Sequence, residues 1–419
     1  MKVDLERFLG ECSCGHAHNI SVKNIFIEEN ASKYLNEILK SYKCPVFICD
    51  SNTKKATEEI LNNYFEKNKT IELVGENIHA DNFNVEYIKE RLVYEADILI
   101  AVGSGTIHDL SRYVAFQKKI PFVSIPTAAS VDGFVSTVAA MTWNGMKKTF
   151  PAKAPIYVLA DTNIFSKAPY RLTASGISDL MGKYTALTDW KISNIVTQEY
   201  FCQRIYDLEM EAVKEVEHIL KEIKFGDRKC IEKLMYALIL SGLAMQMIGN
   251  SRPASGAEHH ISHLWEMSVI NKHIDALHGE KVSVGLILSL EKYEGILKSI
   301  ESDECKVVDN SEFEIELLED TFSKNGLYEE IIKENGDNIL KSVNLNVLED
   351  KLEEIAVELR KLPSSEGIKE KLKSAGCITL MEELKLPDIK ELTLILSPYV
   401  RRRLTLMRIS KLFCGSREY

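Results

Sequence analysis

Over the first 165 residues, short apolar runs alternate with segments whose apolar residues recur at helical spacing. Strand-like runs lie at 20–27, 45–49, 70–74, 96–102 and 156–161. Helical spacing covers 31–42, 54–67, 84–94 and 110–117. This alternation is typical of a parallel sheet with helices on both faces. We therefore expect an α/β domain over residues 1–165.

After residue 168 the pattern predicts helices alone, which indicates a helical domain over residues 166–419. One helix is expected from 174 toward 192, and a nearly all-apolar, buried helix from Ile231 to Met247. The charged stretch 302–366 is expected to form solvated helices and loops. An arginine-rich helix is expected at 399–412, where a solvated face or internal salt bridges are favoured over a partner-binding surface.

Composition narrows the class of partner. The chain has 419 residues, a net charge of -10 and an isoelectric point near 5.6, which disfavours nucleic acid and favours a small-molecule ligand. No stretch reaches the roughly 18 uncharged apolar residues of a membrane span, so we expect a cytoplasmic protein. The nine cysteines are expected to be reduced thiols.

A glycine-containing loop follows the strand that ends at Val102. The order strand, Gly103-Ser104-Gly105-Thr106-Ile107 and helix favours a phosphate-binding loop, although His108 replaces the third glycine of the dinucleotide fingerprint. Asp50 ends an earlier strand, where a carboxylate binds a nucleotide ribose or simply forms a turn. Residues 121–136 are expected to form another strand followed by a second loop, which is rich in small hydroxyl residues and contains one acid, Asp132.

Five of the ten histidines lie between positions 259 and 278. Ser255 and Glu258 form a candidate capping box, so a helix is expected to start at Ser255 with His259 and His263 one turn apart on one face. The preceding Arg252 and its neighbouring amides are candidates for binding a phosphate group.

A separate His278 precedes a glycine, and Asp179 lies in the first turns of an earlier helix. One aspartate and two histidines can bind zinc, nickel or iron and leave positions open for substrate. The alternative for Asp179 is a favourable charge at a helix start.

Residues 11–18, Glu-Cys-Ser-Cys-Gly-His-Ala-His, contain two cysteines and two histidines. This density can ligate a soft metal, whereas the alternative is a surface turn. Because structural zinc sites usually have longer spacers, we favour the turn and leave these residues out of the predicted site.

Together, the loops at 103–106 and 125–133, the Gly176-Ile177-Ser178-Asp179 turn, and the segments 251–259 and 277–280 resemble the sn-glycerol-1-phosphate dehydrogenase family. This family belongs to the superfamily of metal-dependent glycerol dehydrogenases, iron-type alcohol dehydrogenases and dehydroquinate synthases. The resemblance covers about residues 20–290. It implies a Rossmann-like domain followed by a helical, dehydroquinate synthase-like domain.

The resemblance also implies roles for individual residues. A dinucleotide, NAD(H) or NADP(H), would be bound by Asp50, Gly103, Ser104, Gly105, Thr106, Ile107, Thr127, Ser130 and Ser136. One divalent ion would be held by Asp179, His259 and His278, with His260 the alternative to His259. Substrate would contact Asp132, Asp179 and His263, of which Asp179 and His263 would be catalytic.

The implied reaction is the reversible reduction of dihydroxyacetone phosphate to sn-glycerol 1-phosphate, a phosphorylated triose and polyol. Glycerol dehydrogenase activity on free polyols is one alternative. A non-catalytic metal or nucleotide sensor on the same scaffold is the other. Asp179 disfavours a dehydroquinate synthase, because the resemblance implies a glutamate in that family at the position of this metal ligand. Asp50 favours NAD over NADP because a carboxylate repels a 2′-phosphate. A homo-oligomer, a dimer or larger, is expected.

Overall fold

The chain forms two compact units whose segments interleave along the sequence. The structure, a computed structural model, describes residues 3–75 and 78–414. Unit 1 consists of Met1–Asn144, Lys148–Leu180 and Asp207–Ser251. Unit 2 consists of Gly145–Lys147, Met181–Tyr206 and Arg252–Tyr419. In the described residues every named strand lies before residue 162, so the change to helices alone falls where the sequence pattern indicated.

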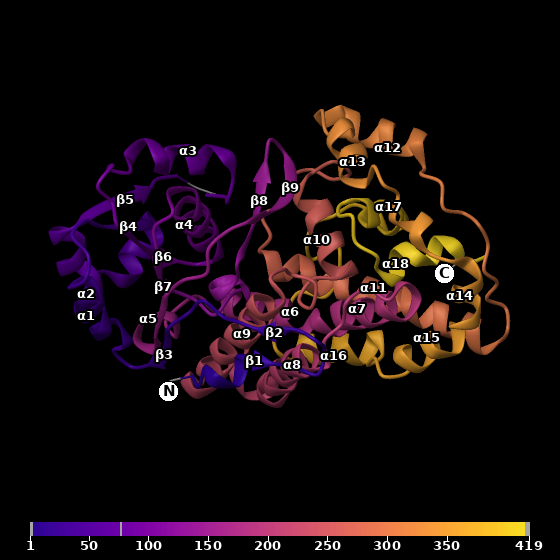
Figure 1. Cartoon of the computed structure of the whole chain (residues 1–419), viewed down its shortest axis with the longest axis horizontal. Helices are drawn as coiled ribbons and strands as arrows, with labels where there is room; N and C mark the ends of the chain where they lie inside the picture. The colour runs from indigo at the N-terminus through magenta and orange to yellow at the C-terminus, as the bar shows by residue number, and fades with distance from the viewer. Residues whose placement is uncertain (1–2, 76–77, 415–419) are drawn as a thin grey trace. The chain divides into compact units, whose positions relative to one another are not determined.

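Unit 1 is built on a six-stranded parallel sheet with the strand order β3-β10-β7-β6-β4-β5 (Figure 1). The predicted fold class, a parallel α/β region followed by helices, is therefore confirmed. The strands of this sheet are β3 (Asn24–Glu28), β4 (Pro45–Asp50), β5 (Lys69–Leu73), β6 (Ile98–Gly103), β7 (Phe122–Pro126) and β10 (Tyr157–Asp161).

The central strand β6 shows why this sheet is covered on both faces. All six of its residues are buried. Leu99 and Ala101 belong to one apolar core and Ile98, Ile100 and Val102 to another, because successive side chains of a strand point to opposite faces. Helices α3 and α4 contribute to the first core, and α1 and α2 contribute to the second.

The helices of unit 1 include two that extend a few residues into unit 2. They are α1 (Leu35–Leu39), α2 (Ser51–Lys67), α3 (Asn82–Arg91), α4 (Gly105–Lys118), α5 (Thr162–Phe165), α6 (Tyr170–Met181), α8 (Gln203–Ile223) and α9 (Arg228–Ile248). The helix predicted at 110–117 begins earlier, at Gly105, inside the glycine loop itself. The segment predicted as one helix at 31–42 is a 3-10 turn followed by α1.

Two small antiparallel sheets complete the strands. One pairs β1 (Gly10–Glu11) with β2 (Ala17–His18), and the other pairs β8 (Val138–Trp143) with β9 (Met146–Pro151). Asn144 and Gly145 connect the second pair with φ angles of 51° and 83°. Positive φ at both central residues is the geometry of a tight hairpin turn, which an Asn-Gly pair favours.

Unit 2 is helical. Its helices are α7 (Lys183–Thr197), α10 (Ala257–Glu266), α11 (His278–Glu301), α12 (Ile315–Phe322), α13 (Tyr328–Asn335), α14 (Leu345–Asp350), α15 (Leu352–Leu359), α16 (Ser365–Ser374), α17 (Lys390–Leu396) and α18 (Leu406–Ile409). The single helix expected from 174 to 192 is two helices, α6 and α7, separated at Gly182.

The prediction of an arginine-rich helix at 399–412 is wrong. Residues 400–405 are not helical, and only the four-residue α18 and short 3-10 turns surround them. The Arg408 side chain is buried and donates to Asn335 Oδ1 (2.7 Å) and to the Pro398 carbonyl (2.6 Å). Tertiary hydrogen bonds therefore replace the solvated helix face that the charge pattern suggested.

Helix α9 is the one helix in the described residues that is long and apolar enough to cross a membrane. In its most apolar window, however, 78% is buried within the protein. This burial is that of a core helix, as the sequence predicted for 231–247.

Helix α6 approaches the 127–136 loop so closely that only glycine fits at position 176. A Cβ atom there would lie 2.2 Å from the Ala129 carbonyl oxygen, which is backbone and has little freedom to move. Gly176→Ala is therefore expected to lower the free energy of unfolding by about 3 kcal/mol, measured by urea denaturation. Gly133→Ala is the matched control, since nothing lies within 4 Å of the position that its Cβ atom would occupy. Equal stability of the two variants would contradict this account of the close approach.

Candidate active site

The glycine loop lies where strand β6 ends and helix α4 begins. Gly103 is the last residue of β6, and Ser104 precedes the first turn of α4. The Thr127 amide, just after β7, donates to the Gly103 carbonyl (3.0 Å) and links this loop to the next one. The predicted residues Gly103–Ile107 and Thr127 therefore meet at the carboxyl edge of the sheet, where α/β folds bind nucleotides.

Asp50 ends β4, the neighbour of β6 in the sheet. Its carboxylate accepts from the Thr53 amide (2.8 Å) and caps helix α2. The structure thus shows the turn-forming role that the sequence left open, and the ribose contact stays a prediction.

The loop from Thr127 to Ser136 is fixed by Arg112, a residue that the sequence analysis missed. Arg112 is fully buried in α4 and donates to the backbone carbonyls of Ser136 and Val138 (both 3.1 Å) and of Gly133. A buried cation that satisfies three carbonyls holds the irregular loop in one conformation. The available signal was an arginine on the otherwise buried face of a helix predicted to pack on the sheet.

Two predicted acids of unit 1 are joined through the same loop. The Asp132 amide donates to Asp179 Oδ2 (3.1 Å), and the Asp132 carboxylate accepts from Ser241 Oγ (2.9 Å). Nearby, Ser175 Oγ donates to the Ser130 carbonyl (3.2 Å). The structure thus brings together Ser130, Asp132 and Asp179 on the loop and on helix α6.

Three histidines of unit 2 form a cluster at the junction of α10 and α11. His259 and His263 lie one turn apart on α10, as predicted, and His278 is the first residue of α11. The ring centroid of His278 lies 5.1 Å from that of His259 and 5.8 Å from that of His263. The imidazoles therefore face a common space.

Glutamates orient two of these rings. His259 Nδ1 lies 2.7 Å from Glu258 Oε1, and His278 Nδ1 lies 3.0 Å from Glu266 Oε1. A carboxylate beside Nδ1 assigns the ring proton to that nitrogen and leaves the Nε2 lone pair available. Carboxylate-oriented imidazoles of this kind are the usual arrangement of histidine metal ligands.

His260 lies in a different environment. Neither of its ring nitrogens has a hydrogen-bond partner in the described structure, although the side chain is buried. Burial lowers the pKa of His260 well below its ordinary value, and the charges of Arg403 and Arg401 lower it further. His260 is therefore a neutral side chain without the orienting carboxylate that His259 has.

The start of α10 is fixed differently from the prediction. The helix begins at Ala257 and not at Ser255, and its N-cap is Gly256 without a side-chain cap. Glu258 Oε1 accepts from the Gly256 amide (2.8 Å), whereas the expected capping box would have joined Glu258 to the Ser255 amide. Asp189 of α7 takes the place of Ser255, because its Oδ2 accepts from the Ala257 amide (2.9 Å).

Asp189 also accepts from the Leu406 amide and the Tyr293 hydroxyl (both 2.7 Å). Burial raises its pKa to about 7, against an ordinary value of 3.8. Between these values the folded protein keeps a proton that the unfolded chain releases, so this carboxyl's contribution to stability falls as pH rises from about 4 to 7. The measured quantity is the unfolding free energy of the wild type minus that of Asp189→Asn, obtained by urea denaturation. Between about pH 4 and 7 this difference is expected to fall by up to about 1.4 kcal/mol per pH unit.

Asp227→Asn provides a control of opposite sign. Asp227 is the exposed N-cap of α9, and the hydrogen bond from the Cys230 amide lowers its pKa. The stability that this carboxylate contributes is present above its ordinary pKa and is lost as pH falls further. If the stability difference between wild type and Asp227→Asn changed with pH in the same direction as that between wild type and Asp189→Asn, the assignment for Asp189 would be contradicted.

Arg252, predicted as a phosphate ligand, is engaged within unit 2. Its Nε and Nη2 donate to the two carboxylate oxygens of Glu199 (2.8 and 3.0 Å), and Nη2 also donates to the carbonyls of Asp189 and Leu404. These bonds fix the segment ahead of α10. Its guanidinium therefore supports the backbone that carries the histidines.

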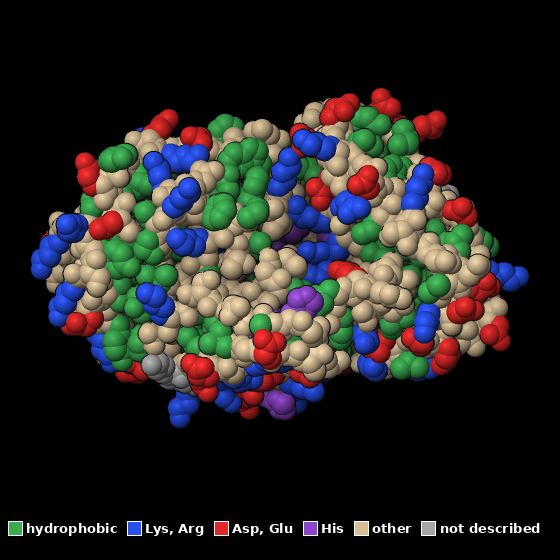
Figure 2. Space-filling model, viewed as in Figure 1, with side chains coloured by type: hydrophobic (Ala, Val, Ile, Leu, Met, Phe, Trp, Pro, Cys, Tyr) green, Lys and Arg blue, Asp and Glu red, His purple; other side chains and the backbone are tan. Residues whose placement is uncertain are grey.

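Other cations lie beside the histidine cluster. Lys147 and Lys281 contact Glu266 at 2.9 and 3.3 Å. Arg401 lies close enough to lower the pKa of His263, which burial already holds well below its ordinary value. Lysine and arginine side chains are also distributed over the face of the molecule shown in Figure 2. This part of unit 2 is consequently suited to an anionic ligand.

Comparison with known proteins identifies the class to which this fold belongs. Residues 26–169 match the family described as iron-containing alcohol dehydrogenase. The glycerol dehydrogenase of Schizosaccharomyces pombe shares the fold with a TM-score of 0.61 and 16% identity, covering 98% of this chain and 89% of that chain. An archaeal Red Sea brine pool alcohol dehydrogenase gives 0.60 and 17%, covering 91% and 92%.

Sequence relatives narrow this class further. A glycerol-1-phosphate dehydrogenase (NAD(P)+) of Geobacillus thermodenitrificans is 36% identical over 296 residues, covering 68% of this chain and 73% of that protein. Its counterpart in Halalkalibacterium halodurans is 34% identical over 371 residues, covering 84% and 92%. The chain belongs to the glycerol-1-phosphate dehydrogenase family, as its resemblance predicted.

Proposed function

We propose that this chain is an NAD(P)-dependent, metal-containing dehydrogenase that reversibly reduces dihydroxyacetone phosphate to sn-glycerol 1-phosphate. The similar proteins carry the name glycerol-1-phosphate dehydrogenase (NAD(P)+). The observation that carries the proposal is the pair of carboxylate-oriented imidazoles, His259 and His278, beside unit 2 cations that suit a phosphorylated substrate.

The donor set fits one divalent ion. Two imidazoles with their Nε2 lone pairs available and the Asp179 carboxylate would together provide a ligand set that zinc, nickel and iron all accept. When bound, such an ion polarises the oxygen of an alcohol or ketone as a Lewis acid. We assign the ligands to Asp179, His259 and His278. His259 is preferred to His260 because only His259 has an orienting glutamate.

We assign the dinucleotide to the carboxyl edge of the unit 1 sheet, with its phosphates at Gly103–Ile107 and the remaining contacts from Asp50, Thr127, Ser130 and Ser136. The start of α4 offers backbone N–H groups to a pyrophosphate. NAD is favoured over NADP by the carboxylate of Asp50, and the cytoplasm is the proposed location. A homo-oligomer also remains a proposal.

We assign substrate orientation to Asp132, Asp179 and His263. His263 is neutral, because burial lowers its pKa well below the ordinary value, and its Nδ1 is buried without a hydrogen-bond partner in the described structure. A neutral imidazole would relay a proton to the substrate oxygen by accepting one from a water molecule at one ring nitrogen and donating the other ring proton. A bound nicotinamide would supply the hydride. For the phosphate group we propose Arg401 in place of Arg252.

The direct test is oxidation of NADH and of NADPH with dihydroxyacetone phosphate or dihydroxyacetone, on enzyme stripped of metal and resupplied with zinc, nickel or iron. Strong turnover is expected with the phosphorylated ketone alone. Preference for free dihydroxyacetone would instead identify a glycerol dehydrogenase. Absence of turnover with every ion and both nucleotides would favour a non-catalytic sensor.

A further inference from the structure

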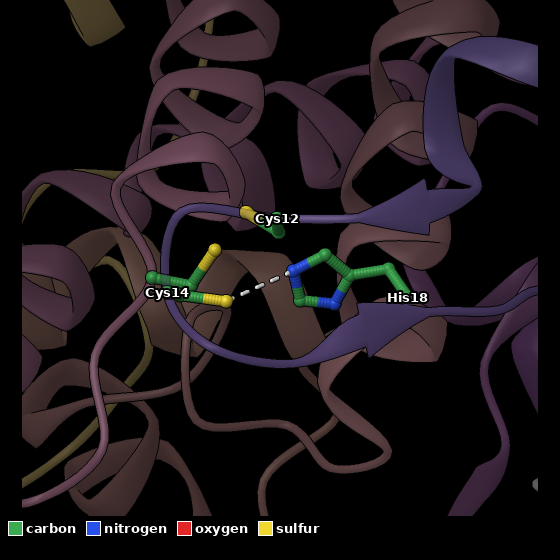
Figure 3. Close-up of side chains that lie close together, drawn as sticks. Cys12, Cys14 and His18 are labelled. Atoms are coloured by element: carbon green, nitrogen blue, oxygen red, sulfur yellow. Dashed lines mark hydrogen bonds between the residues drawn. The ribbon is translucent and has the colours of Figure 1, made fainter.

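The hairpin β1–β2 brings together metal-binding side chains that lie far from the proposed active-site residues in sequence. Gly10 pairs with His18 and Glu11 with Ala17, so the chain reverses between positions 12 and 16. The Gly15 amide donates to the Cys12 carbonyl (3.0 Å), and Gly15 has a φ of +86°. This tight turn returns His18 toward the two cysteines (Figure 3).

The three donor atoms are spaced as metal ligands are. Sγ of Cys12, Sγ of Cys14 and a ring nitrogen of His18 all lie within 4.8 Å of one another. Cys14 Sγ is 3.4 Å from His18 Nε2. Tetrahedral zinc with Zn–S of about 2.3 Å and Zn–N of about 2.0 Å separates sulfur from nitrogen by roughly 3.6 Å. The short sequence spacing is therefore compatible with one ion, because the turn supplies the convergence.

His18 is also held in the tautomer that a metal requires. Its side chain is 1% exposed, and its Nδ1 lies 3.0 Å from the carbonyl oxygen of Met247 near the end of α9. A carbonyl accepts only, so Nδ1 carries the proton and Nε2 presents its lone pair toward Cys14. Backbone carbonyls orient metal-bound histidines in this way.

We propose that Cys12, Cys14 and His18 bind a structural Zn²⁺ ion. Two thiolates and one imidazole suit zinc, whose tetrahedral shell is completed by a fourth donor from protein or water. The exposed His16 is not part of this group. This ion is separate from the ion of the proposed reaction, whose ligands include no sulfur.

The ion would fasten the hairpin to α9. Each strand of the hairpin has only two residues, which is too short for independent stability. Through His18, the ion connects this segment to the carbonyl at the end of α9. Zinc binding therefore adds folding free energy to the N-terminal segment of unit 1.

Cobalt substitution tests the proposal on the full-length wild-type chain. Purified protein is stripped of metal under a reducing phosphine and titrated with Co²⁺. A near-ultraviolet sulfur-to-cobalt charge-transfer band is expected, and one equivalent of Zn²⁺ should abolish it. Because the other proposed ligands are oxygen and nitrogen, this band reports the cysteine site whether or not the chain is a dehydrogenase. Absence of the band at saturating Co²⁺ would overturn the proposal.

Variants assign the band to these residues. Cys12→Ser/Cys14→Ser should lose the band and one zinc per chain, measured by elemental analysis of zinc-replete protein. Cys44→Ser/Cys305→Ser is the matched control, since both of these cysteines are partly buried like Cys12 and Cys14. It should keep both signals. Loss of the band in the control alone, or equal zinc content in all three proteins, would contradict the assignment.

Discussion

Replacement of His259 by alanine is expected to remove the ion of the proposed reaction and to lower kcat for dihydroxyacetone phosphate by about three orders of magnitude. The size follows from losing several kcal/mol of charge stabilisation at the reacting oxygen, at about 1.4 kcal/mol per tenfold in rate. The physical reason is the hydrogen bond of His259 Nδ1 to the buried Glu258, which assigns Nε2 as the ligand atom. Turnover and bound metal are measured on the same metal-replete sample.

His260→Ala is the matched control. This neighbour is equally a buried histidine of α10, but neither ring nitrogen has a partner in the described structure. We expect the His260 variant to keep its metal and at least roughly a tenth of the wild-type kcat, within about 1.4 kcal/mol of the wild-type barrier. If His260→Ala lost the metal while His259→Ala kept it, the ligand assignment would pass to His260.

Glu258→Gln tests how much the orientation of the His259 ring contributes to metal binding while His259 itself is kept. The glutamate also accepts from Thr185 Oγ1 (2.6 Å) and the Gly256 amide, so it is fixed before any ion binds. A glutamine at this position no longer assigns the Nδ1 proton of His259. The metal affinity is expected to fall about 10- to 100-fold, the usual cost of losing an orienting partner. A metal affinity equal to that of the wild type would show that Glu258 only supports the helix start.

The sheet was predictable because its signals are local. A strand that is buried on both faces, such as β6, appears in the sequence as a continuous apolar run. The glycine loop is recognised because it directly follows such a run. At Gly103 the reason is visible, since a Cβ atom would lie 2.5 Å from the side chain of Ile107. The spacing of His259 and His263 on one helix is equally local.

The remaining features depend on contacts between segments distant in sequence. Ser255 has the composition of a helix cap, yet Asp189, 68 positions before Ala257, accepts from the first amide of the helix. Arg252 was a reasonable phosphate ligand by position, but Glu199 and Leu404 engage it. Neither partner could be inferred from the spacing of residues around position 252. The convergence of Cys12 and His18 likewise required the turn at Gly15 to be seen.

The environment of Arg401 likewise depends on contacts between segments that are distant in sequence. Arg401→Gln is expected to lower kcat/KM for dihydroxyacetone phosphate about 10- to 100-fold, the contribution of a hydrogen bond to a charged group. The rate with free dihydroxyacetone, however slow, should be unchanged. Steady-state kinetics with the two ketones measure the difference directly.

The physical reason is that one nitrogen of the Arg401 guanidinium lacks a hydrogen-bond acceptor. Arg401 Nη2 is buried without a hydrogen-bond partner in the described structure. Burial lowers its pKa to about 10, opposed by the charges of Glu334 and Glu266, so the group is still a cation at neutral pH. A buried cation with an unpaired donor costs free energy unless a ligand supplies the acceptor. A phosphate beside the histidine cluster would supply it.

Arg402→Gln provides the matched control one position away. The Arg402 side chain is 48% exposed and faces Asp337 at 4.0 Å, so the same loss of charge occurs in solvent. Long-range attraction of the phosphorylated substrate should change equally in both variants and should weaken with added salt. A direct contact to phosphate should appear in Arg401→Gln alone and persist at high salt. Equal losses for the two variants would reduce the role of Arg401 to general electrostatic attraction, leaving phosphate recognition to Lys147, Lys281 or Arg403.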